Sequence, residues 1–180
     1  LCATMAKAQE GDFVSYVNPL IGTLSSFELS AGNTYPATAM PWGMNFWTPR
    51  TAKVGDGWQY PYTANKIYGF EQTHQPSPWI NDHGTFLMTV QNDIIGNNGD
   101  SAWSGYRIKD SILRPDYMKL GFLRSECTLE LVPSDRCASV KVSFENDFDR
   151  CISIFGIKGN NSFEIRDGAL YGWTDSRSGM

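Results

Sequence analysis

The stretch CTLELVPSDRCASVKVSF, residues 127–144, indicates the fold more clearly than any other part of the chain. A short segment of turn composition, residues 133–136, divides it into two halves, and apolar residues take every second position in both. This period of two is typical of strands with one buried and one exposed face, so the stretch predicts a half-buried antiparallel pair. The alternating residues are Leu129, Leu131, Val140, Val142 and Phe144.

Short runs with strand composition follow one another along the rest of the chain. Most are rich in β-branched or aromatic residues and are bounded by Gly, Pro, Asn or Asp. No amphipathic helix pattern is visible. We therefore predict an all-β fold, an antiparallel β-sandwich. The predicted strands are residues 44–48, 57–62, 85–90, 105–109, 117–123, 127–132, 137–144, 151–156, 163–166 and 169–173.

The composition narrows the classes of partner. The chain has 180 residues, enough for one domain with a core or for one part of a larger protein. The net charge is -4 and no Lys/Arg cluster occurs, which argues against a nucleic-acid or anionic-membrane surface. No apolar run approaches the ~20 residues that a transmembrane helix needs. We expect neither a nucleic-acid partner nor a transmembrane segment.

Residues 1–11 have the features of a residual export signal or a flexible N-terminus. Ala6-Lys7-Ala8 ahead of Gln9 is a small-x-small cleavage pattern. An alternative is that Cys2 ends a lipobox and carries a lipid anchor, and an ordinary terminus is a third interpretation. We expect an exported bacterial protein, periplasmic, cell-surface or secreted, with a single domain over residues 12–180.

Three cysteines lie on predicted strands. Cys127, Cys137 and Cys151 lack the C-x-x-C spacing of a zinc site or a redox motif. A 127–137 or a 137–151 disulfide is open to an exported protein, but neither pair falls directly opposite if tight hairpins join the strands. Small buried thiols are the favoured interpretation.

The stretch QTHQPSPWINDHG, residues 72–84, is the strongest candidate for a functional loop, because it concentrates both histidines, a tryptophan and an Asn-Asp pair. The chain has no G-x-S-x-G nucleophile elbow, and the histidine spacing matches none of the usual metal-ligand patterns. Sugar binding fits better, since it requires flat aromatic platforms and fixed amide or carboxylate groups.

The candidate sugar platforms are Trp58 and Trp79, whereas Trp42 and Trp47 flank apolar residues and are assigned to the core. Hydrolysis normally requires two carboxylates across the scissile bond. The loop-rich half, residues 12–104, shows no convincing pair, so we expect this part to hold a sugar without cutting it. The candidate polar ligands are Asn33, Gln59, Gln72, His74, Asn81 and Asp82.

Four motifs occur in an order that resembles a known family. They are VNPLIGT (17–23), GNTYPATAMPWGM (32–44), IYGFEQTHQPSPWINDHG (67–84) and RPDYMKL…ELVPSDR (114–136). Together they resemble the N-terminal domain of glycoside hydrolase family 92, the exported, calcium-dependent α-mannosidases, over most of residues 14–157.

The resemblance implies an architecture and a reaction. Family members pair an N-terminal, supersandwich-like β-sandwich with a larger (α/α)6-barrel domain and hydrolyse α-linked mannose with inversion. The general acid Glu, the general base Asp and most calcium ligands come from the helical domain. Residues 12–180 are therefore expected to hold no catalytic residue and no metal ligand, and to be inactive alone. The implied partners are a mannose-containing glycan and the C-terminal barrel domain; a stand-alone carbohydrate-binding module is the alternative.

The resemblance also assigns roles to residues at matching positions. Trp58, ahead of the GF-x-x-TH motif, matches a wall of the leaving-sugar subsite. His74 and Asp82 stand at the TH and (N/S)D-x-G positions, with Gln72 and Asn81 beside them.

The chain departs from the family pattern at two places. His83 stands where the family commonly has Tyr after that Asp, so the resemblance assigns this position no role. The QPSPW variant of a Ser-Gly-rich turn leaves the linkage specificity undefined.

Overall fold

The computed structural model describes residues 12–24, 26, 28, 34–53, 60–73, 84–92, 98–147, 149–157 and 159–175. In these residues the chain forms β-strands together with short 3-10 helices, among them η1 (Phe13–Tyr16) and η3 (Ile108–Asp110), and no α-helix. The predicted all-β fold is confirmed. None of the helices in the described part of the chain has the length and apolarity needed to span a membrane.

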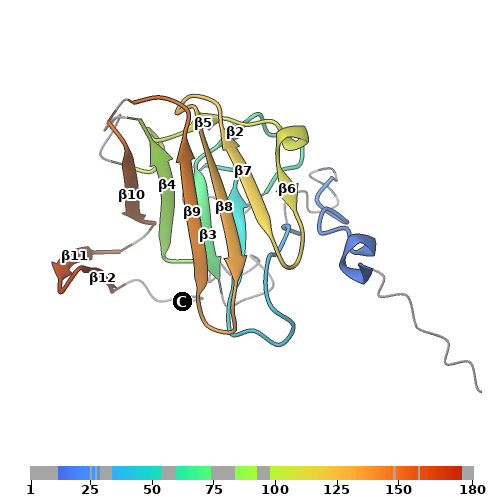
Figure 1. The fold of residues 1–180 in the computed structure, drawn as a ribbon, viewed down its shortest axis with the longest axis horizontal. Helices are drawn as coiled ribbons and strands as arrows, with labels where there is room; N and C mark the ends of the chain where they lie inside the picture. The colour runs from blue at the N-terminus through green and yellow to red at the C-terminus, as the bar shows by residue number, and fades with distance from the viewer. Residues whose placement is uncertain are drawn as a thin grey trace, which may run out of the picture.

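Two four-stranded antiparallel sheets stack on each other, with β8 and β9 in front of β3 and β4 in Figure 1. The first sheet has the order β1-β3-β4-β10, formed by β1 (Phe46–Arg50), β3 (Gly69–Thr73), β4 (Phe86–Gln91) and β10 (Cys151–Gly156). The second has the order β6-β7-β8-β9, formed by β6 (Ile112–Leu113), β7 (Met118–Phe122), β8 (Cys127–Pro133) and β9 (Ala138–Phe144).

Two smaller strand pairs complete the described structure. β2 (Lys66–Ile67) pairs with β5 (Ser104–Gly105), and β11 (Asn161–Arg166) pairs with β12 (Ala169–Thr174). The β11–β12 hairpin projects from the sandwich beyond β10, at the lower left of Figure 1. It therefore extends the fold on the side where β9 and β10 form the sheet edges.

The apolar residues that alternate in the stretch 127–144 face the core, as predicted. Leu129 pairs with Val142 and Leu131 with Val140, so all four side chains point toward the first sheet. Both leucines are fully buried against residues of β3, β4 and β7. The core cluster is Trp47, Ile67, Phe70, Val90, Tyr106, Met118, Leu120, Phe122, Cys127, Leu129 and Leu131.

The strand predictions for 85–90, 117–123, 127–132, 137–144, 151–156, 163–166 and 169–173 are confirmed to within two residues. The strand predicted at 44–48 forms two residues later, as β1. The prediction for 105–109 is wrong, because β5 ends at Gly105 and the Asp110 N–H donates to the Arg107 carbonyl in a helical turn. The prediction for 57–62 lies partly outside the described residues, and residues 60–62 are not strand.

The two tryptophans assigned to the core differ. Trp47 is buried and packs against Phe70, with 6.2 Å between ring centroids, as predicted. Trp42 is fully exposed, so its prediction is wrong. It lies in a tight turn, in which the Gly43 N–H donates to the Met40 carbonyl, and its φ of 64° belongs to the left-handed region. The turn directs its ring away from the sandwich.

The cysteine prediction is confirmed in part. Cys127, Cys137 and Cys151 are all free thiols. Cys127 is buried and Cys151 is half-buried, whereas Cys137 is exposed and contradicts the prediction of a buried thiol. Cys137 precedes β9 in the turn after β8, where its Sγ lies 3.0 Å from Ser134 Oγ. The turn, not the strand, determines its exposure.

The first sheet has two unlike faces. Its inner face, toward the second sheet, carries apolar core side chains such as Trp47, Phe70 and Val90. The strand alternation places a mostly polar set on the outer face, and its members are also withdrawn from solvent, at 1% exposure or less. These buried polar residues are Thr48, Arg50, Glu71, Thr89 and Gln91. The outer face is therefore covered, and its polar groups require partners.

Candidate functional site

Gln72 is the predicted substrate-binding residue that the structure describes. It lies at the penultimate position of β3, is exposed, and pairs with Trp47 of β1. The structure therefore tests no contact between two predicted site residues, and their assignment stays a prediction. The other candidates, which lie outside the described residues, are Asn33, Trp58, Gln59, His74, Trp79, Asn81 and Asp82.

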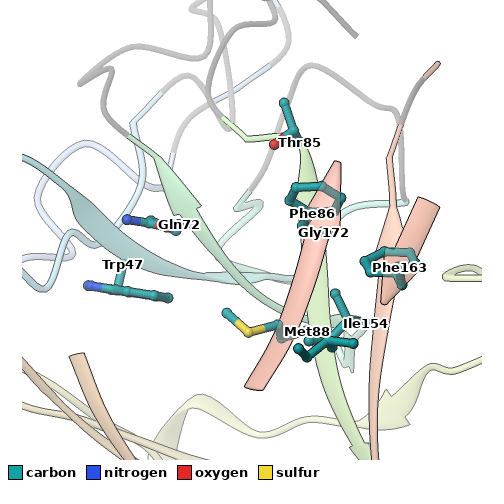
Figure 2. Close-up of a pocket in the computed structure, with 9 residues that line it drawn as sticks. Trp47, Gln72, Thr85, Phe86, Met88, Ile154, Phe163 and Gly172 are labelled. Atoms are coloured by element: carbon teal, nitrogen blue, oxygen red, sulfur yellow. The ribbon is translucent and has the colours of Figure 1, made fainter. Parts of the chain in front are cut away.

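A cavity of about 290 Å³ opens beside Gln72. Figure 2 shows Phe86 and Met88 of β4 on one side of it and Phe163 and Gly172 of the β11–β12 hairpin on another. The Phe86 and Phe163 rings lie 5.6 Å apart, centroid to centroid, in a tilted contact. The cavity is thus enclosed between the inner face of the first sheet and the hairpin, and its lining is Trp47, Gln72, Thr85, Phe86, Met88, Ile154, Phe163, Leu170 and Gly172.

The lining limits what this cavity can do. Among the described lining residues, Gln72 and Thr85 have hydrogen-bonding side chains besides the Trp47 indole, and none is a carboxylate, histidine or cysteine. The described lining can enclose an apolar group and donate or accept hydrogen bonds at one end. Sequence reasoning found Gln72 and missed its neighbours, because they come from strands distant in the chain.

Buried tyrosines lie beside one of the undescribed candidate segments. Tyr60, which directly follows Gln59 in the chain, is fully buried, and its hydroxyl lies 3.1 Å from that of Tyr106. Burial raises the pKa of both phenols above the ordinary tyrosine value. Both therefore stay protonated at neutral pH and act as hydrogen-bonding anchors, not as bases.

The described residues offer no metal centre. Within the ranges given above, no group of three or more His, Cys, Asp or Glu side chains is placed to hold a metal ion. Several of the described carboxylates are engaged with basic groups, as in the ion pair of Arg114 with Asp116, which lowers the pKa of that aspartate. The expectation that the calcium ligands lie mainly outside residues 12–180 stays a prediction.

The chain matches the profile described as the glycosyl hydrolase family 92 N-terminal domain over residues 16–177. Among solved structures, it is similar to the family GH92 inverting mannosidase BT2199 from Bacteroides thetaiotaomicron VPI-5482, with 38% identity and a TM-score of 0.83. That match covers 93% of this chain and 23% of the mannosidase. A search among curated proteins found no match.

Two further structures share the fold at lower identity. The family GH92 α-mannosidase BT3965 from Bacteroides thetaiotaomicron has 22% identity and a TM-score of 0.59, over 77% of this chain and 19% of that protein. The GH92 family glycosyl hydrolase ccman5 has 18% identity and a TM-score of 0.66, over 89% and 24%. In each case the chain spans about a quarter or less of the relative's length.

Proposed function

Because this chain belongs to glycoside hydrolase family 92, we propose that residues 12–180 are the N-terminal β-sandwich domain of an inverting α-mannosidase. The observation that carries the proposal is the 38% identity to an inverting mannosidase over 93% of the chain. The reaction belongs to the parent protein, whose catalytic Glu and Asp we assign to a following (α/α)6-barrel domain. Inversion places those carboxyls about 6.5–9.5 Å apart, with the attacking water between.

Exposed apolar side chains support the proposal that further chain packs on this sandwich. Ile152 pairs with Val90 on the inner face of the first sheet, yet it is 63% exposed. Val140 pairs with the buried Leu131 on the second sheet and is 44% exposed. Both lie on edge strands of the same side of the sandwich, where the hairpin projects (Figure 1). Exposed apolar side chains that gather on one side of a domain are typical of surfaces that meet a partner.

In this proposal the sandwich contributes sugar contacts and no acid or base. Gln72 and the seven candidates outside the described residues would complete a mannose pocket at the domain interface, with Trp58 and Trp79 as aromatic platforms. Calcium, a cation that prefers oxygen ligands, would be held by the helical domain, where it would orient sugar hydroxyls. The proposed substrate is a mannose-containing glycan, and the proposed setting is an exported bacterial protein.

The test compares the parent protein with residues 1–180 alone, each with calcium and with a chelator present. We expect the parent protein to release mannose from α-mannosides and the short chain to release none. Turnover by residues 1–180 would contradict the assignment of the acid and base to a later domain. Mannoside binding by residues 1–180, together with an inactive parent protein, would instead support the alternative of a carbohydrate-binding module.

A further inference from the structure

The strand β9 forms a free edge of the second sheet. It pairs with β8 along its whole length, and no described strand pairs with its other side. The Glu145 N–H, directly after β9, donates to the Glu126 carbonyl beside β8, so the odd-numbered residues of β9 direct their backbone groups toward β8. The direction alternates along a strand, and the even-numbered residues therefore direct their N–H and C=O groups to the free edge. These outward residues are Ala138, Val140, Val142 and Phe144.

This edge lacks the features with which natural proteins usually prevent a free edge from pairing. Its sequence, ASVKVSF, contains no proline, and its unbroken register with β8 leaves no bulge. Its charged residue, Lys141, lies 3.3 Å from Glu130 of β8, so the charge points back over the sheet and not across the edge. At the other end of the sandwich, β6 has two residues, and Trp47 of β1 exchanges two 2.9 Å backbone hydrogen bonds with Thr38. The β9 edge is long, regular and open by comparison.

The first sheet extends beyond β9 without a cover. In Figure 1, β9 lies in front of β3 and β4, and no described strand of the second sheet lies in front of β10. Ile152 of β10 points to the inner face and is 63% exposed, and Ile154, on the same face, lines the cavity next to Met88. A strand added to β9 would lie about 4.8 Å from it and would place its inward side chains over these isoleucines. The space therefore fits an extended segment with an apolar residue at every second position.

We propose that the free edge of β9 pairs with one further β-strand, contributed by the part of the parent protein that follows residue 180. The match to 23% of a mannosidase's length supports a source in the parent protein. The described chain ends at Asp175, whose N–H donates to the Asn160 carbonyl at the base of the hairpin, on the same side as β9 and β10. The source of the strand rests on the proposed function.

A second copy of this chain fits the edge less well. Two β9 strands in full antiparallel overlap would place Lys141 directly opposite Lys141 of the second copy. Like charges at directly opposed positions destabilise a strand pair. The charge pattern of β9 thus favours a different sequence as its partner.

Hydrogen exchange of single β9 amides in the full-length parent protein tests the pairing. We expect the amides of Val140, Val142 and Phe144 to exchange at least about a hundredfold more slowly than in an unstructured chain, as the odd-numbered amides bonded to β8 do. Mass spectrometry with electron-transfer fragmentation resolves these sites. Protection that alternates along β9, with the even-numbered amides exchanging freely, would show an unpaired edge and overturn the proposal.

A proline at the centre of the edge separates backbone pairing from side-chain packing. Val140→Pro removes an outward N–H and leaves the hydrogen bonds to β8 in place, and the matched control Val140→Ala shortens the side chain but keeps the N–H. In the parent protein we expect Val140→Pro to accelerate exchange at Val142 and Phe144 by about tenfold or more, and Val140→Ala by less than about threefold. Equal acceleration in the two variants would contradict a hydrogen-bonded strand.

A cross-link identifies the strand. The photoreactive residue p-benzoyl-L-phenylalanine replaces Ser139, an exposed residue of β9, in the parent protein, and mass spectrometry locates the linked peptide after irradiation. We expect a link within one molecule to a segment after residue 180 in which apolar residues alternate. A link to a second copy or to another protein, or no link beyond residue 180, would refute the proposed source. Exchange and cross-linking do not depend on turnover, so a parent protein that hydrolyses no α-mannoside contradicts the proposed function separately.

Discussion

Two sides of the same sandwich bury their apolar residues to very different extents. On β7 and β8, Met118, Leu120, Leu129 and Leu131 are 0% exposed. On β10 to β12, Ile152, Ile165 and Trp173 are 63%, 80% and 58% exposed. Strand alternation operates on both sides, so the difference lies in what covers the strands. The β7–β8 side, called the finished side below, has a fully buried apolar core. The β9–β12 side, called the open side below, has apolar side chains that no other described residue covers.

This difference between the two sides indicates where further chain would pack on the domain in a larger protein. The chain matches 23% of a family GH92 mannosidase with a TM-score of 0.83, so this core belongs to one part of that larger fold. The open side contains the cavity beside Gln72, which lies between the first sheet and the β11–β12 hairpin. Both observations fit the proposal that further chain packs against the side formed by β9 to β12.

The largest expected effect comes from creating a cavity in the buried core of the β7–β8 side. Leu129→Ala should lower the free energy of unfolding by about 2–5 kcal/mol, because it removes a fully buried side chain and leaves a cavity. Ile165→Ala, on the open side, should change it by no more than about 0.5 kcal/mol. Denaturant unfolding of residues 1–180 measures both. Similar losses at the two positions would contradict the contrast between the two sides.

Alkaline pH should also lower the free energy of unfolding, because ionisable groups are buried in the core. Burial raises the pKa of the Cys127 thiol from 9.0 to about 12, and it raises the pKa of Tyr60 and Tyr106. The folded state therefore keeps protons that the unfolded state releases, so stability is fully present below about pH 9 and falls as the pH rises from there toward 12.

Melting temperatures recorded from pH 8 to about pH 11 test this expectation. We expect a steady fall above about pH 9, and Tyr106→Phe should make it shallower. A melting temperature that stays constant across the range would contradict the burial of these groups in one core.

The thiols should report the same contrast through their reactivity. Cys127 is buried with a raised pKa, whereas Cys137 is exposed in the turn before β9. Because the thiolate is the reactive form, iodoacetamide at pH 8 should alkylate Cys137 at least about tenfold faster than Cys127. Peptide mass spectrometry over time measures both rates, with Cys137→Ser as the control. Equal rates in the folded protein would show that the β8 core opens readily.

The smallest expected effect is weak self-association of residues 1–180 through the open side. Placing charges there, as in Ile152→Lys/Ile165→Lys, should lower the weight-average mass measured by light scattering at high protein concentration. Ser139→Lys/Ser143→Lys, which adds the same two charges at exposed polar positions of β9, is the matched control and should leave the mass unchanged. An equal decrease in both variants would assign the effect to net charge and not to the apolar side.

The sequence predicts the regular strands well because their alternation follows from burial on one face. This signal identified β8 and β9, and the structure adds their register, in which Leu129 pairs with Val142. It missed β3, in which Gly69, Phe70, Glu71 and Thr73 are all buried, because a strand covered on both faces shows no alternation. It also placed Trp42 in the core, because composition does not reveal a left-handed turn.

The candidate site was predictable only in part. Gln72 was found from its motif, and the structure adds the aromatic neighbours Phe86 and Phe163, which come from a distant strand and hairpin. The buried ion pair of Arg50 with Glu71, on the outer face of the first sheet, likewise had no local signal, since the pairing of β1 with β3 brings the two residues together. Local patterns therefore indicate loops and strands, while contacts between distant strands define the surroundings of the site.

The measurement that tests the central claim most directly is the anomeric form of mannose released by the parent protein. Proton NMR of an α-mannoside during the first minutes of reaction should show β-mannose appearing first and α-mannose only later, by mutarotation. Residues 1–180 alone should release neither anomer under the same conditions. Initial release of α-mannose, or the absence of any mannose release by the parent protein, would contradict the assignment of this chain to an inverting α-mannosidase.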